Sequence, residues 1–112
     1  MYVGRSVSGR GTLELVQTVP KEGLYLIISV PETSATGDSE KVIFFVTDAA
    51  GIKMAQEEGT FLINGVTPIH MGSLYAFTGK VGGFPQPDNA LAEAGYGNLI
   101  IIEGRVSDIR KV

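Results

Sequence analysis

Leu24-Tyr25-Leu26-Ile27-Ile28-Ser29-Val30 is a continuous apolar run, and it decides the fold class. Gly23 precedes the run and Pro31 ends it, so its length suits a strand and is short for a helix. Because polar side chains do not alternate with apolar ones, the run predicts a strand that is buried on both faces.

Two further runs of the same kind lie along the chain. Residues 41–47 contain Val42-Ile43-Phe44-Phe45-Val46, and residues 99–106 contain Leu99-Ile100-Ile101-Ile102. Gly104 inside the last run predicts a bulge or the close approach of another backbone. The three runs together predict the core of the protein.

Turn signals separate the remaining short apolar segments. Asn64-Gly65 is the dipeptide that best fits a type I′ hairpin, since both central residues of that turn need positive φ. Pro68 then predicts that the second arm of the hairpin lies at a sheet edge. Short segments at such regular spacing are typical of an all-β sandwich or barrel. We predict a β-sandwich, jelly-roll-like or immunoglobulin-like, with about seven or eight short antiparallel strands, although a barrel stays open because strand order is not written in the local pattern.

The chain is expected to form one domain preceded by a short arm. Residues 1–11 hold glycines, serines and two arginines with few apolar groups, which predicts a flexible basic arm, whereas residues 12–112 predict a single β-domain. Residues 80–98 form a long excursion rich in glycine and proline, with one helical turn expected over residues 89–94. Long loops in small domains are usually functional or ordered by a partner.

Composition narrows the classes of function. The 112 residues carry a net charge of −3, which argues against a nucleic-acid binder, and contain no cysteine, which excludes disulfides and thiolate metal sites. Only 19% of the residues are charged, below the roughly 25% usual for globular proteins, and this favours a homo-oligomer or multi-copy assembly. Neither a signal peptide nor an apolar membrane span is expected, so we predict synthesis in the cytoplasm.

The candidates for chemistry are weak. His70 is the one histidine and reads better as a partly exposed residue at a strand end than as a base or a ligand. Gly37-Asp38-Ser39 lacks the downstream partners of a hydrolase, and the acids of residues 32–40 match no calcium loop, although ion binding there stays open. The glycines at 79, 82 and 83 lack the strand and helix of a phosphate-binding motif and favour chain mobility. We therefore predict no enzyme activity, cofactor or metal.

Four residues are the predicted partner-binding positions. Arg5 and Arg10 lie in the basic arm, where they would contact an acidic protein surface or, with weak and salt-sensitive binding, phosphate. Phe84 lies between Gly83 and a proline, and Tyr96 between two glycines, so we expect both rings to be exposed. Aromatic and arginine side chains dominate the binding energy of many interfaces.

As a class, the chain resembles the small β-rich decoration, or cement, proteins of tailed-phage capsids. The resemblance rests on its size, the glycine-rich start, the turn-rich strand pattern and the lack of catalytic groups. It implies a non-enzymatic protein of the virion that stabilises a capsid shell through protein contacts. The alternative is a small carbohydrate- or ligand-binding module that uses Tyr75, Phe84, Tyr96 and the carboxylates of residues 32–40. The alternative location to the virion is the cytoplasm.

Overall fold

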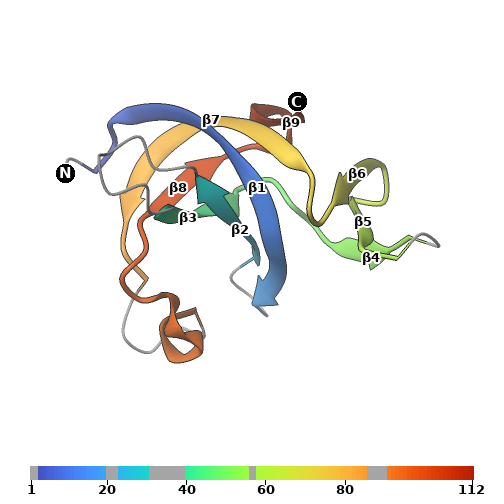
Figure 1. Ribbon diagram of the computed structural model, residues 1–112, viewed down its shortest axis with the longest axis horizontal. Coiled ribbons are helices and arrows are strands. Elements are labelled where there is room, and N and C mark those ends of the chain that lie inside the picture. Colours follow the sequence, from blue (N-terminus) through green and yellow to red (C-terminus); the bar gives the residue numbers. More distant parts are fainter. Residues whose placement is uncertain (1–2, 20–22, 31–39, 56–57, 86–90) are drawn as a thin grey trace.

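A computed structural model describes residues 3–19, 23–30, 40–55, 58–85 and 91–112 (Figure 1). The strands in these residues are β1 (Ser6–Val19), β2 (Gly23–Val30), β3 (Glu40–Val46), β4 (Ile52–Met54), β5 (Thr60–Ile63), β6 (Thr67–His70), β7 (Leu74–Gly83), β8 (Ile101–Gly104) and β9 (Ile109–Lys111). Two short helical turns are η1 (Ala92–Tyr96) and η2 (Val106–Asp108). The predicted all-β class is confirmed, and no described helix is long and apolar enough to cross a membrane.

The larger sheet closes on itself through β1. Its order is β1-β2-β3-β8-β7-β9, and the first half of β1 also pairs with β7. Thr12 lies where the two ladders meet, since it is opposite both Ser29 of β2 and Leu74 of β7. A β-bulge between Leu13 and Leu15 lets β1 turn from one neighbour to the other. The closed part is a five-stranded barrel rather than the predicted sandwich.

The pairing also differs from the expected fully antiparallel arrangement. β3 and β8 run parallel, with Ile43 opposite Ile101 and Val46 opposite Gly104, while the other ladders are antiparallel. Local sequence patterns give the length and faces of a strand but do not tell which strand will be its neighbour. The strand order therefore could not be predicted from the local sequence pattern.

The run that predicted a strand buried on both faces is β2, and its burial is confirmed. Leu24, Leu26 and Ile28 point into the barrel, whereas Tyr25 and Ile27 belong to a second apolar cluster on its outer side. Alternate residues of a strand point to opposite faces, so one continuous apolar run fills two cores.

The start of β1 differs from the expected flexible arm. Residues 6–11 pair with β7, from Ser6 opposite Lys80 to Gly11 opposite Tyr75. The glycines make this possible by their small size, because a Cβ at Gly9 would lie 2.9 Å from the Phe77 ring, and one at Gly11 would overlap the Ser29 carbonyl. Glycine here serves close packing, which composition alone does not distinguish from mobility.

A second, three-stranded sheet is formed by β4, β5 and β6 and extends from one end of the barrel (Figure 1). Its β5–β6 turn has positive φ at Asn64 (57°) and Gly65 (76°), as the predicted type I′ hairpin requires. Ile63 and Ile69 anchor this sheet in the barrel core. Pro68 lies in β6, which is an edge strand as expected.

The segment 91–99 covers the outer side of the barrel. Leu91 is fully buried against Tyr25, Ile27 and Ile43, and Tyr96 and Leu99 pack at the margin of the same cluster. A helical turn was predicted over residues 89–94; the described part of the chain has η1 at Ala92–Tyr96, and residues 89–90 lie outside the described residues. The barrel is therefore enclosed by its own chain on this side.

Candidate functional site

The structure brings Arg5 and Phe84 to the same end of the β1–β7 ladder. The Gly4 amide donates to the Val81 carbonyl (2.7 Å), and the Val81 amide donates to the Arg5 carbonyl (2.9 Å), so the pairing continues beyond Ser6. Val3 consequently lies beside Gly83, the residue before Phe84. Val3 is 73% exposed and Phe84 56%, as we expected for Phe84. We call Val3, Arg5 and Phe84 the ladder end.

Arg10 lies apart from the ladder end, in a group of cations that the sequence does not reveal. Arg10 of β1 pairs with Ala76 of β7, and Ala76 pairs on its other side with Arg110 of β9. Residues in one cross-strand row point to the same face. Tyr75 and Phe77 point into the barrel, so Ala76 between them points outward, and so do Arg10 and Arg110 in the same row. Lys80, four residues after Ala76 in β7, lies on the same outer face. We call Arg10, Lys80 and Arg110 the basic face.

Arg110 and Lys80 were missed because no local motif marks them. They are separated from Arg10 by most of the chain, and only the strand register places the three together. The sequence predicts Arg10 in a flexible arm, whereas the structure holds it in a paired strand. Fixed cations lose less entropy on binding than mobile ones.

Tyr96 lies elsewhere and is less exposed than predicted. Its ring packs at the margin of the cluster formed by Tyr25, Ile27, Ile43 and Leu91. The neighbouring Gly95 has a φ of 98°, a value that favours glycine and bends the chain back onto the barrel. A binding role for Tyr96, as for Arg5, Arg10 and Phe84, stays a prediction.

The three-stranded sheet offers two edges, and they differ. β6 carries Pro68, which has no N–H and so hinders the addition of another strand. β4 has no neighbour on its outer side among the described strands. The backbone N–H of Asn64 donates to the Gly51 carbonyl, and the backbone N–H of Ala55 donates to the Thr60 carbonyl. Because alternate residues of a strand direct their backbone N–H groups to opposite sides, the Met54 N–H points away from β5. The Met54 side chain is 77% exposed.

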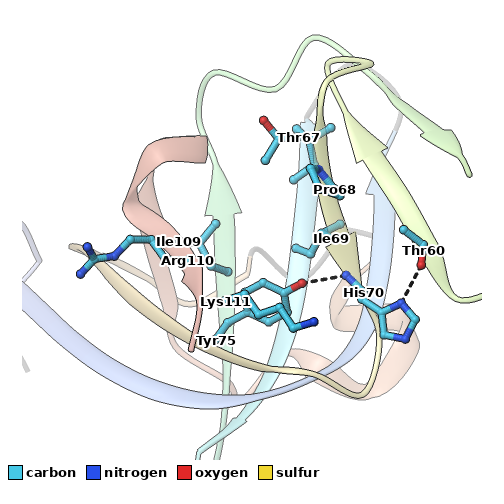
Figure 2. Close-up of a pocket in the computed structure, with 10 residues that line it drawn as sticks. Thr60, Thr67, Pro68, Ile69, His70, Tyr75, Ile109, Arg110 and Lys111 are labelled. Atoms are coloured by element: carbon cyan, nitrogen blue, oxygen red, sulfur yellow. Dashed lines mark hydrogen bonds between the residues drawn. The ribbon is translucent and has the colours of Figure 1, made fainter.

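His70 lies at the mouth of a cavity of about 470 Å³ beneath this sheet, shown in Figure 2. Its Nδ1 is 2.6 Å from the Thr60 hydroxyl, and its backbone N–H donates to the Tyr75 hydroxyl at 2.8 Å. Its half-buried ring agrees with our interpretation of a residue at a strand end. The residues that the structure describes contain no group of three metal-ligating side chains.

Of three remaining sequence candidates, two lie wholly or almost wholly outside the described residues, and the third, the glycines at 79, 82 and 83, lies in β7. Residues 37–39 and the acidic segment 32–40, apart from the backbone of Glu40, lie outside the described residues. The glycines at 79 and 82 lie in β7, and a Cβ at either would meet Glu103 of β8. Close packing of two strands explains them better than the mobility we expected.

Comparisons with known proteins add no relative. A scan against protein-family models, a search of curated proteins and a search of solved structures each returned no match.

Proposed function

We propose that this protein is a non-enzymatic structural protein that assembles in multiple copies through the open edge of β4. The observation that carries the proposal is this edge, with an exposed Met54 side chain and a backbone amide directed away from β5. An unpaired strand edge forms backbone hydrogen bonds with an added strand, and the side chains beside it give selectivity.

The contrast between the two edges supports the choice of β4. Proline on an edge strand is a common means of preventing unwanted strand addition, and Pro68 protects β6 in this way. Ile52–Met54 contains no proline, although Lys53 places a charge in this short strand. Within the three-stranded sheet, strand addition is therefore directed to the β4 edge.

The ladder end supplies a second contact in this proposal. Phe84 and Val3 expose apolar area beside Arg5, and aromatic and arginine side chains are enriched at protein interfaces. Contacts at two distant parts of the molecule would let one copy bridge two neighbours. Decoration of a capsid shell, which the class resemblance implies, is the form of assembly we propose.

Replacing Met54 by proline tests the β4 contact. Met54→Pro removes the outward amide and leaves the Lys53 position, which alternation pairs with β5, intact. We expect sedimentation equilibrium to show concentration-dependent oligomers for the native protein and at least tenfold weaker association for the variant.

The matched control is Val112→Ala, which truncates an exposed apolar side chain outside the β4–β6 sheet and should leave association unchanged. A native protein that stays monomeric at every concentration, or equal association of Met54→Pro and native protein, would overturn the proposal.

Single-stranded nucleic acid is the second candidate partner, and the basic face favours it. The order β1-β2-β3-β8-β7 with closure by β1 resembles that of OB-type barrels, but the face of the second and third strands, where such barrels bind oligonucleotides, is covered here by segment 91–99. Such a likeness concerns the fold only. The basic face adds Arg10, Lys80 and Arg110 on one outer surface, despite the acidic chain.

Fluorescence anisotropy with a labelled oligothymidylate tests this second candidate. If the basic face holds phosphates, the native protein binds with an affinity that falls as salt rises, and the double variant Arg10→Ala/Arg110→Ala binds about tenfold or more weakly with a shallower salt slope. Lys53→Ala, which removes an exposed cation from β4, is the control. Equal binding by both variants would exclude the basic face.

A further inference from the structure

The cavity below the three-stranded sheet combines apolar walls with a cation. Ile63 and Ile69 come from the β5–β6 hairpin and Ile109 from β9, and all three are buried. Its volume of about 470 Å³ lies within the range of roughly 300–1,000 Å³ typical of small-molecule sites. The cavity therefore has the size and the walls for a small organic ligand.

Lys111 supplies the positive charge. It is directly opposite Tyr75 in the β7–β9 ladder, so the two side chains share a face. Figure 2 shows the Lys111 side chain beside the Tyr75 ring, with its amino group directed towards His70, while the Arg110 guanidinium points away from the cavity. The ammonium group and the Tyr75 hydroxyl are thus presented on the same side of the cavity.

The charged side chains that line the cavity favour an anionic ligand. No carboxylate is among the residues that line the cavity, although the whole chain has a net charge of −3. The ion pair found in the described part of the chain joins Lys41 and Glu14, away from this site. Lys111 therefore has no described acidic partner and is available to an anion from solution.

The Tyr75 hydroxyl is suited to a second contact. It accepts the His70 backbone N–H at 2.8 Å, which fixes the position of its oxygen, and a hydroxyl that accepts one bond still has its own proton to donate. A carboxylate at this point would accept from both Tyr75 and Lys111. Hydrogen bonds between charged partners are the stronger class.

From these features we infer that the cavity binds a small organic anion, with its charged group on Lys111 and Tyr75 and its apolar body against Ile109 and the exposed ring of Pro68. The inference is independent of the assembly proposed above, because neither the Met54 edge nor the ladder end lines the cavity.

Titration followed by ¹H–¹⁵N correlation spectra tests the inference with three probes: benzoate, its uncharged analogue benzamide, and inorganic phosphate. We expect benzoate to cause saturable shifts at the amides of His70, Tyr75 and Lys111. Benzamide lacks the charge and phosphate lacks the apolar body, so each should bind at least about tenfold more weakly.

Two variants complete the test. Lys111→Met keeps the aliphatic stem but removes the charge, and should weaken benzoate binding about tenfold or more while the other amide signals keep their native positions. Lys53→Met, with a lysine outside the cavity, should bind benzoate as the native protein does. Benzoate binding unchanged in Lys111→Met, equal affinity for benzamide or phosphate, or an absence of shifts at these three residues would each overturn the inference.

Discussion

Gly9 and Gly11 show that glycine in this chain is a packing residue. Both lie in the paired first half of β1, where the ring of Phe77 and the backbone of Ser29 occupy the space that a side chain would need. The same two residues, read only as composition, predicted mobility. Their partners come from β7 and β2, so nothing adjacent in the sequence identifies the constraint.

Gly11→Ala tests this role. The new methyl group would overlap the Ser29 carbonyl, a backbone group that cannot rotate away, so β1 and β2 must separate. We expect the free energy of unfolding to fall by about 1–3 kcal/mol, the usual cost of overpacking. Urea denaturation followed by circular dichroism measures it as a lower midpoint.

Gly51→Ala is the matched control, because a Cβ there meets no atom within 4 Å and the residue does not have positive φ. Its midpoint should stay near the native value. If the two variants had the same stability, residues 6–11 would not be packed as the structure describes.

By contrast, Asn64-Gly65 was predictable at the residue scale. Positive φ at both positions is a property of the dipeptide itself, and the turn forms as expected. The Asn64 side chain does more than the turn requires, since its oxygen accepts the Ala50 amide and its amide group donates to the Asp48 carbonyl. Those contacts depend on the β3–β4 connection and could not be inferred from the hairpin signal.

Among the elements, the segment 91–99 departs most from its expected role. The excursion was expected to be a contact surface for a partner, yet its described part lies on the outer side of the barrel with Leu91 fully buried. The apolar residues that face outward from β2 and β3 explain this arrangement, because they would otherwise be exposed to water. Phe84, which precedes the buried part, keeps the exposure that we expected.

Leu91→Ala distinguishes a structural segment from a partner-ordered one. Removal of a fully buried leucine leaves a cavity, and we expect the free energy of unfolding to fall by about 2–5 kcal/mol. Thermal unfolding monitored by calorimetry gives the change.

Leu74→Ala makes the same truncation in a leucine that is 41% exposed and should cost clearly less. An effect of Leu91→Ala no larger than that of Leu74→Ala would mean that the segment does not contribute to the isolated fold.

For the whole molecule, the sequence predicted the strands better than their arrangement. The three apolar runs correspond to β2, β3 and β8, because strand length and burial are encoded in neighbouring residues. The barrel closes because β1 pairs with both β2 and β7. No local sequence pattern predicts this double pairing. The candidate sites follow the same division: the exposed Phe84 was found, whereas the basic face and the cavity arise from register between distant strands.

The double pairing of β1 also constrains the order in which the chain can fold. Its second half meets β2 across a short connection, but its first half must wait for β7, 64 to 74 residues later in the chain. Contacts between residues this far apart in the sequence require the closure of a long loop, which has an entropic cost and slows folding. Residues 6–11 precede their partners in β7 along the chain, so they cannot pair until β7 has been made.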